Sequence, residues 1–363
     1  MDDWGLTANS RIYDPFVGAG TTLLAAKARG IPTVGADISP LSVFVTNAKV
    51  ASYPPDALSE TWDKIQRAIG RLPLPAKLKH SPFLEKALEL KTHQNLERIR
   101  QAIVQEADKA SKQFFLMALL RVLPHYSRAL PDGGWFRWRR VRASAETTSL
   151  RFAQTVEKML ADLQHLNGNH KPGDWHAYNH DARLPLERCG KFDALITSPP
   201  YANRHDYTRI FTTELLFLFL NEDELKQLRH KNLRSHVEAR ATCLHTNGWK
   251  PSKKAEEVLG RLSDVPDKRV PRMIRGYFED MHLTLAACKR AMKRGGHMAF
   301  VVGNVQHAGV HVPVDVILAD LGDEVGLKWK ETWVIRLRGN SAQQMGRYGR
   351  QPSRESVVIF DVP

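Results

Sequence analysis

The chain has 363 residues, of which 42% are hydrophobic and 25% charged, with 23 glycines and 20 prolines. These values are ordinary for globular proteins, so they exclude collagen, a coiled coil and wholesale disorder. A chain of this length is expected to form two or three modules around a core large enough for an enzyme. The formal net charge of +14 at pH 7 favours a polyanionic partner, with nucleic acid ahead of an anionic membrane.

Cysteine and histidine spacing indicates neither disulfides nor bound metals. Cys189, Cys243 and Cys288 are odd in number and form no CxxC pair, which fits a reducing compartment. The fifteen histidines show no HxH or HExxH spacing, so no metal site is expected. The start MDDWGL is acidic, unlike a signal peptide, and the apolar run around 215–220 is too short to span a bilayer. We therefore expect a cytoplasmic protein that makes no membrane contact.

The first predicted elements form a β-α-β unit. Residues 11–13 predict a strand that leads into the sequence DPFVGAGTT and a helix over 22–29, which ends at Gly30. A second strand is predicted over 32–38, and Ser39 and Pro40 then provide an N-cap and a first-turn proline for another helix. This order is typical of the start of a doubly wound α/β sheet with helices on both faces.

Two segments interrupt the α/β pattern. Helix periodicity over 83–108, 111–123 and 146–166 predicts a helical insertion at 54–173, and a basic insertion is expected at about 202–275. The expected domains are 1–53 and 174–363, which together form the α/β domain, with 54–173 as the insertion. The other predicted elements are strands over 175–179, 192–197, 297–302, 331–338 and 355–361, helices over 277–292 and 313–321, and a turn at Gly295-Gly296.

The loop DPFVGAGTT lies between a predicted strand and a predicted helix, where glycines allow positive φ and a ligand's close approach to the backbone. It lacks the third glycine of GxGxxG and the GK[ST] of a P-loop, which weakens the dinucleotide and ATP interpretations. Asp37 ends the next strand, 19 residues after Gly18, where a carboxylate can accept hydrogen bonds from two ribose hydroxyls. An adenosine ligand fits this pair; the alternative is a tight β-α turn with an acidic strand end.

The segment TSPPY follows an apolar strand and is therefore expected at the carboxyl edge of the sheet, where open α/β proteins bind their ligands. Pro199 and Pro200 stiffen the loop and remove two backbone donors. The remaining carbonyls and Ser198 can accept hydrogen bonds from an exocyclic amino group, and Tyr201 can stack on an aromatic ring. The alternative is a rigid turn with no chemical role.

The pair DPFVGAGTT and TSPPY resembles the motifs of the bacterial DNA amino-methyltransferases, which use S-adenosylmethionine. The resemblance covers 10–53, 174–203 and 275–361 and implies a Rossmann-like class I methyltransferase sheet. It implies that Asp37 binds the cofactor's ribose and that Asp181, in the sequence HDARLP, lies near its adenine amino group; a loop acid or helix cap is the alternative for Asp181. The full set of implied cofactor-binding residues is Asp14, Phe16, Gly18, Gly20, Thr21, Asp37, Ile38, Asp181 and Ala182.

The resemblance implies a catalytic loop formed by Ser198, Pro199, Pro200 and Tyr201. The lone pair of an exocyclic amine is delocalised into the ring, so the amine is a poor nucleophile until hydrogen-bond acceptors draw it toward tetrahedral geometry. A methyltransferase acting on cytosine C5 would need a thiolate that follows a proline, and no cysteine here does. The target base must leave the duplex stack, and Tyr201 is the expected stacking partner.

Basic and aromatic residues suggest where DNA binds. The segment WFRWRRVR at 135–142 interleaves rings with guanidinium groups that suit phosphates and base edges; a solvated face with a packed tryptophan is the alternative. A second basic stretch spans 229–240, and some of its side chains are expected to order the catalytic loop. The predicted DNA-binding residues are Arg137, Arg139, Arg140, Arg142, Arg204 and Arg234.

These observations predict a methyltransferase that modifies N4 of cytosine in duplex DNA, with a restriction or defence-system subunit as a partner. Serine as the first residue of SPPY favours cytosine. The alternatives are an N6-adenine DNA methyltransferase, an RNA base methyltransferase and the DNA-binding subunit of a split enzyme. Only about ten residues precede the first predicted strand, where most family members have a segment that contacts methionine. We expect 4–10 with 338–350, or another chain, to replace it. The order of the motifs is similar to the family's α arrangement, with target recognition in 54–173.

Overall fold

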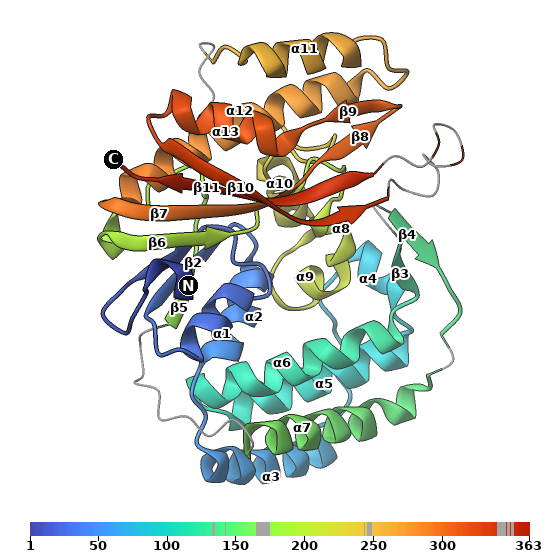
Figure 1. Cartoon of the computed structure of the whole chain (residues 1–363). Helices are drawn as coiled ribbons and strands as arrows, with labels where there is room; N and C mark the ends of the chain where they lie inside the picture. The colour runs from blue at the N-terminus through green and yellow to red at the C-terminus, as the bar shows by residue number, and fades with distance from the viewer. Residues whose placement is uncertain are drawn as a thin grey trace. The chain divides into compact units, whose positions relative to one another are not determined.

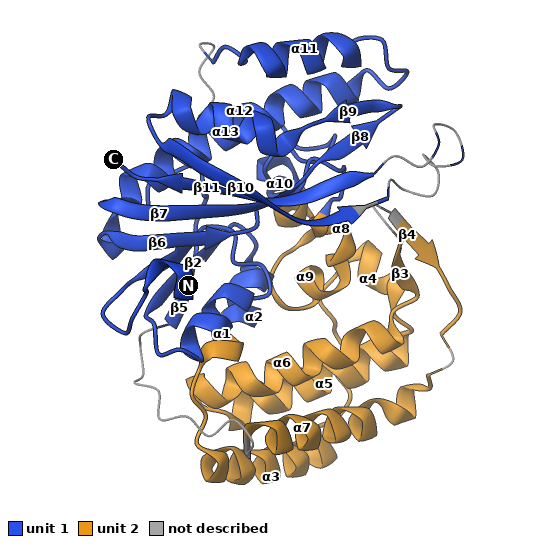
Figure 2. Ribbon diagram, viewed as in Figure 1, with its two compact units in different colours: residues 1–46, 174–206, 227–363 blue, residues 47–173, 207–226 orange. Residues whose placement is uncertain are grey.

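The computed structural model describes residues 1–132, 135–141, 143–164, 175–242, 244, 249–339, 346, 349 and 352–363. The chain divides into two compact units (Figure 2). Unit 1 comprises residues 1–46, 174–206 and 227–363, and unit 2 comprises 47–173 and 207–226. The basic segment expected at about 202–275 is therefore divided between the units, because 207–226 belongs to unit 2.

Unit 1 contains a sheet that, among the described residues, has the strand order β10-β11-β7-β6-β1-β2-β5. The strands β5, β2, β1, β6 and β7 run parallel, and β11 lies antiparallel between β7 and β10. The bounds are β1 (Ile12–Asp14), β2 (Thr33–Asp37), β5 (Trp175–Asn179), β6 (Phe192–Thr197), β7 (Met292–Gly303), β10 (Lys328–Arg338) and β11 (Ser353–Asp361).

Helices cover both faces of this sheet (Figure 1). Side chains alternate along a strand, and in β1 Ile12 packs with Ala26 of α1 (Thr21–Lys27). Its neighbour Tyr13 belongs instead to the core that includes Phe278 of α12 (Arg269–Ala291) and Leu318 of α13 (Val314–Glu324). The predicted α/β fold with a helix-covered Rossmann-like sheet is confirmed.

Two predicted boundaries in unit 1 differ most from the structure. The expected turn at Gly295-Gly296 lies inside β7, where Gly295 has a φ of 77° and the pairing of β6 with β7 shifts register. The strand therefore continues through an irregularity instead of starting after it. The helix expected to begin at Tyr277 begins at Arg269, because apolar residues such as Val270 and Met273 extend its buried face.

The other described elements of unit 1 are short. They are η1 (Asp2–Trp4), η3 (Glu187–Cys189), α11 (Lys253–Leu262), β8 (Val305–His307) and β9 (Val310–Val312), while α2 (Pro40–Val50) and α10 (Glu222–Lys231) run from one unit into the other.

Unit 2 is built mainly of helices, and its core includes the packed rings of Trp62, Phe115 and Phe152. Two predictions need correction here. The helix expected over 83–108 is interrupted, because Leu88 and Glu89 are extended. The insertion also contains an antiparallel hairpin of β3 and β4. The bounds are α3 (Pro55–Arg71), α4 (Pro82–Ala87), α5 (Leu90–Glu106), α6 (Lys109–Tyr126), β3 (Ala129–Asp132), β4 (Trp135–Trp138), η2 (Ala145–Thr147), α7 (Thr148–Gln164), α8 (Tyr207–Ile210) and α9 (Thr212–Leu218).

None of the helices in the described ranges is long and apolar enough to cross a membrane.

Candidate active site

The parallel strands of unit 1 bring the predicted site segments to one edge of the sheet. Asp14, Asp37, Asn179 and Thr197 are the last residues of β1, β2, β5 and β6, and these strands are parallel neighbours. The chain leaves β1 toward β2 on one side and later returns as β6 on the other, so the edge has a topological switch point at β1. Open α/β sheets bind their ligands at such points.

The glycine loop after β1 has the backbone that its sequence predicts. Gly18 and Gly20 have φ of 50° and 82°, in the left-handed region that favours glycine. A Cβ on Gly20 would lie 2.9 Å from Oγ1 of Thr46, which donates a hydrogen bond to the Gly18 carbonyl at 3.2 Å. Phe16 is half-buried against the core, and Thr21 is exposed at the first turn of α1. The loop is therefore held in shape while its outer face stays accessible.

Asp37 holds the glycine loop and the start of the next segment together. Its carboxylate accepts hydrogen bonds from the Gly18 N–H at 3.0 Å and the Ser39 N–H at 2.8 Å, one on each oxygen. Burial, partly offset by these bonds, raises the pKa of Asp37 to about 6. Each carboxylate oxygen can accept a second hydrogen bond. The Ser42 side chain also donates to this carboxylate, so Asp37 keeps capacity for a further hydroxyl group beside its backbone contacts.

Asp14 connects the glycine loop to the strand that carries the TSPPY loop. Its side chain is 3% exposed, and its Oδ1 accepts hydrogen bonds from Thr197 Oγ1 at 2.6 Å and the Phe16 N–H at 3.1 Å. Burial raises the pKa of this carboxyl group. The sequence predicts Asp14 as a cofactor-binding residue, and the structure gives its Oδ1 two partners inside the protein. Thr197 Oγ1 is one of them, so the two motif loops share a direct contact.

The third predicted segment lies beside β2. The amide of Asn179 donates to the Ile38 carbonyl at 2.8 Å, which ties the end of β5 to the residue after Asp37. Asp181 accepts two hydrogen bonds from the guanidinium of Arg183, at 2.9 and 2.7 Å, and Ala182 between them is buried. Asp181 therefore has a fixed orientation.

Arg183 was not among the residues predicted for the site. Its side chain is 1% exposed, and it also pairs with the buried Asp280 of α12 at 3.2 Å. Asp280 in turn accepts hydrogen bonds from Arg234. A buried charge network thus holds Asp181 in place. Arg183 is visible in the sequence HDAR, but nothing local in the sequence indicates that it pairs with Asp280.

The residues of the TSPPY loop differ in how far they are exposed to solvent. Ser198 is exposed, Pro199 is buried and Pro200 is half-buried. The hydroxyl of Tyr201 donates to Oε1 of Glu355 at 2.7 Å, and Glu355 also pairs with Arg336 of β10. A Cβ on Gly303 would lie 3.1 Å from the Tyr201 ring, so the ring approaches the backbone of β7 closely. Glycine at 303 and the acceptor on β11 together fix the ring.

The predicted DNA-binding arginines fall into two groups, one in each unit. In unit 2, Arg137 is 69% exposed, whereas Arg139 donates to the carbonyls of Ser127 and Pro124. Arg140 is exposed, and Arg142 lies outside the described residues.

The two arginines of unit 1 both form ion pairs. Arg204 has a φ of 73° and pairs with Asp267 at 3.0 Å, while its side chain stays 40% exposed. Arg234 is 11% exposed and pairs with Glu279 and Asp280. The guanidinium of Arg234 is therefore engaged inside unit 1.

The sheet edge fits the nucleoside part of S-adenosylmethionine. A Cβ on Gly18 would meet nothing closer than the Phe16 carbonyl at 3.9 Å, so the backbone there is open to a ligand. Asp37 has accepting capacity left for ribose hydroxyls, and Asp181 retains some on Oδ2 for an amino group. Among the described residues, no cluster of three or more potential ligands could hold a metal ion.

The similar proteins found by sequence comparison are all type II methyltransferases. No family model matches the sequence. The type II methyltransferase M.BsoBI of Geobacillus stearothermophilus is 29% identical, over all of this chain and 82% of that protein. M.AvaI of Nostoc sp. is also 29% identical, over 97% of this chain and 80% of that protein. M.MvaI of Kocuria varians is 22% identical, over 86% of this chain and 74% of that protein.

Among solved structures, a TehB-like SAM-dependent methyltransferase from Corynebacterium glutamicum matches with a TM-score of 0.32 and 8% identity, over all of this chain and 85% of that one. A TM-score this low does not by itself identify a shared fold.

Proposed function

We propose that this chain, which belongs to the S-adenosylmethionine-dependent DNA methyltransferases, methylates the exocyclic N4 of cytosine in duplex DNA. Its similarity to three type II methyltransferases over most of their lengths supports an enzyme of a restriction-modification system. The observation that carries the proposal is the hydrogen bond from Thr197 to Asp14, which joins the cofactor-type glycine loop to the loop of the TSPPY motif. The choice of cytosine depends on serine as the first residue of SPPY.

The chain's own residues would bind the cofactor through the glycine loop and the neighbouring strand ends. Asp37 would accept hydrogen bonds from the ribose, and the backbone at Gly18 and Gly20 would lie against the nucleoside and the methionine part. Asp181 would accept a bond from the adenine amino group through Oδ2. When bound, S-adenosylmethionine supplies an electrophilic methyl group whose carbon a nitrogen lone pair can attack, with the sulfonium sulfur leaving as a neutral thioether.

The catalytic loop would make the amine a better nucleophile. Ser198 is exposed and can turn its hydroxyl toward an incoming base, and the Pro199 carbonyl offers a second acceptor. Hydrogen bonds from the amino group to these acceptors reduce delocalisation of its lone pair into the ring. The methyl carbon of a bound cofactor would then pass to the amine nitrogen, the C–S bonding pair would leave with the thioether sulfur, and the surplus proton on the nitrogen would go to water. Positioning accounts for most of the acceleration, because no covalent enzyme intermediate is required.

Tyr201 would hold the flipped base. A base must leave the duplex stack to reach the loop, and stacking on an aromatic ring recovers part of that cost. The hydroxyl of Tyr201 is anchored on Glu355 and its ring lies against Gly303. A ring held at two points needs little further ordering when the base arrives.

The test is transfer of a tritiated methyl group from S-adenosylmethionine to unmethylated host DNA, followed by nucleoside analysis. N4-methylcytosine in duplex DNA is the expected product. N6-methyladenine alone would change the assigned base and leave the enzyme class intact. Methylation of structured RNA but not of DNA would overturn the proposal. Absence of S-adenosylmethionine binding in calorimetry would favour a DNA-binding subunit that needs another chain.

A further inference from the structure

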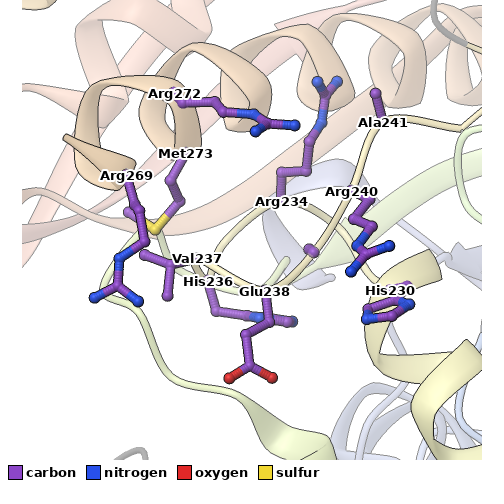
Figure 3. Close-up of a pocket in the computed structure, with 11 residues that line it drawn as sticks. His230, Arg234, His236, Val237, Glu238, Arg240, Ala241, Arg269, Arg272 and Met273 are labelled. Atoms are coloured by element: carbon purple, nitrogen blue, oxygen red, sulfur yellow. The ribbon is translucent and has the colours of Figure 1, made fainter.

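A basic pocket lies within unit 1, apart from the sheet edge described above (Figure 3). It has a volume of about 470 Å³ and is formed by the start of α12 and the segment 230–241. Figure 3 shows side chains from both elements around it. The charged and titratable residues that line it are His230, Arg234, His236, Glu238, Arg240, Arg269 and Arg272.

Two of the four arginines in this lining already have strong carboxylate partners. Arg234 pairs with Glu279 and Asp280 at 2.9 and 3.0 Å, and Arg269 pairs with Asp267 at 2.9 Å. The one carboxylate in the lining, Glu238, lies 3.7 Å from Arg229.

Arg240 and Arg272 differ from the other two arginines of the lining in having no carboxylate partner among the described residues. Both are exposed, and within the part of the chain that the structure describes neither has a carboxylate within 4.0 Å. The first turn of α12 adds positive potential, since it contains no acidic residue and its N-cap makes no side-chain hydrogen bond. Two arginines of the lining, Arg240 and Arg272, therefore keep a positive charge with no carboxylate partner within 4.0 Å among the described residues.

The pocket is connected to the segment that follows the catalytic loop. The Arg204 N–H donates to the Ser235 carbonyl at 3.0 Å, and the Arg204 guanidinium binds Asp267, the partner of Arg269. Asp206, which is 3% exposed, pairs with Arg229 at 3.0 Å and lies 3.9 Å from His236 in the pocket wall. A group bound in the pocket would therefore lie beside the residues that follow Tyr201.

We propose that Arg240 and Arg272 bind a phosphate of the DNA strand that carries the target base. The inference depends on the proposed function. Guanidinium groups bind phosphate oxygens in a bidentate geometry. A phosphate would also supply the negative charge that Arg240 and Arg272 lack as a partner. A nucleotide flips by rotation about its own backbone, so the adjoining phosphates must be held close to the catalytic loop. The pocket provides that hold, because its segment 230–241 contacts Arg204 shortly after Tyr201 in the chain.

The experiment compares the full-length Arg240→Ala/Arg272→Ala variant with wild type and with Arg275→Ala. Arg275 is an exposed arginine of α12 that does not line the pocket, so it controls for loss of one positive charge from the same helix. Binding of a mixed-sequence duplex is measured by fluorescence anisotropy over a series of salt concentrations. S-adenosylmethionine binding is measured by calorimetry, and methyl transfer to host DNA gives KM and kcat.

We expect the double variant to bind duplex DNA roughly tenfold more weakly, with a salt slope lower by about 0.9 for the one phosphate lost. KM for DNA should rise by a similar factor while S-adenosylmethionine affinity stays unchanged. Arg275→Ala should match wild type in each measurement. Inorganic phosphate should compete with the duplex for wild type and lose that effect in the double variant.

Wild-type DNA affinity and salt slope in the folded double variant would overturn the inference. Phosphate binding that depends on the two arginines without any change in DNA affinity would also overturn it, because the pocket would then take free phosphate only. If wild type transfers no methyl group to DNA, the proposed function fails, whereas the anisotropy comparison still decides whether the pocket holds a DNA phosphate.

Discussion

The sheet edge of unit 1 and the basic hairpin of unit 2 hold their predicted functional residues in opposite ways. At the sheet edge, Asp14, Asp37 and Tyr201 each make hydrogen bonds within the protein that fix their orientation. On β4 of the hairpin and just after it, Arg137 and Arg140 are exposed. Methyl transfer needs groups aligned before the substrate arrives, whereas phosphate neutralisation depends on charge and tolerates movement. Substitutions should therefore have large effects at the sheet edge and graded effects on the hairpin.

Tyr201→Ala should have the largest effect. We expect methyl transfer to fall by roughly 100-fold, because base stacking is worth about 1 to 3 kcal/mol and a misplaced amine loses the in-line geometry. S-adenosylmethionine affinity should stay near wild type. Tritiated methyl transfer and calorimetry measure the two quantities separately.

Tyr201→Phe is the matched control, since it keeps the ring and removes the hydroxyl that donates to Glu355. It should retain more activity than the alanine variant. Full activity of Tyr201→Ala would reduce TSPPY to a structural turn.

Asp37→Asn should weaken S-adenosylmethionine binding by roughly 1 to 3 kcal/mol, through loss of charge-assisted hydrogen bonds to the ribose. Asparagine is a better test than alanine. One of its side-chain atoms can still accept a backbone N–H, whereas alanine leaves both the Gly18 and Ser39 donors without Asp37. Calorimetry on the folded variant provides the measurement, and unchanged affinity would exclude Asp37 from the cofactor site.

The pKa of about 6 for Asp37 also gives two opposite pH dependences. Wild-type cofactor affinity should fall as pH decreases through about 6, because protonation removes the charge, and the Asp37→Asn variant should show no such step. Stability should change in the other direction. A carboxyl whose pKa is raised from 3.8 on folding destabilises the native state progressively as pH rises from 3.8 to about 6. Denaturant unfolding of wild type and variant across this range tests the second trend.

Glu355→Gln should have a smaller effect on the same loop. Glutamine can still accept a hydrogen bond from Tyr201 but loses the ion pair with Arg336. We expect methyl transfer to fall about fivefold, which corresponds to about 1 kcal/mol from a loosened ring. If Glu355 acts only through Tyr201, the Tyr201→Phe/Glu355→Gln double variant should be no slower than Tyr201→Phe alone. An additive loss would assign Glu355 a separate role.

The sequence was most informative where a single segment determines the structure. Strands over 175–179 and 192–197 were predicted with the bounds that β5 and β6 have, because β5 alternates buried and exposed residues and β6 is a mostly buried apolar run, two local patterns typical of strands. The break at Leu88-Glu89 was missed, since neither glycine nor proline marks it. The hairpin of β3 and β4 was not predicted, because each of its strands has only four residues.

For the candidate active site too, the sequence predicts local motifs but not contacts between distant residues. Both motif loops could be recognised from their own residues, and their roles in binding remain predictions. Glu355 could not be found, because it lies 154 residues from Tyr201 and carries no motif of its own. Arg183 was visible in HDARLP, but its pairing with Asp280 spans 97 residues. Contacts of this kind follow from how distant strands, loops and helices pack in the fold, which no local pattern specifies.

Arg137→Ala/Arg140→Ala should have the smallest effect, and it tests the hairpin side of the comparison. Both arginines are exposed, and Arg137 lies 3.8 Å from Asp132, so neither substitution should disturb packing. If each neutralises one phosphate, the salt slope of DNA binding should fall by about 1.8 for the pair.

The matched substitution, directly after β4 of the same hairpin, is Arg139→Ala. Because Arg139 donates to the carbonyls of Ser127 and Pro124, its loss should lower the free energy of unfolding by about 1 kcal/mol and change the slope less. Equal salt slopes for wild type and the Arg137/Arg140 variant would make this part of the hairpin a solvated face and remove both arginines from the DNA-binding residues.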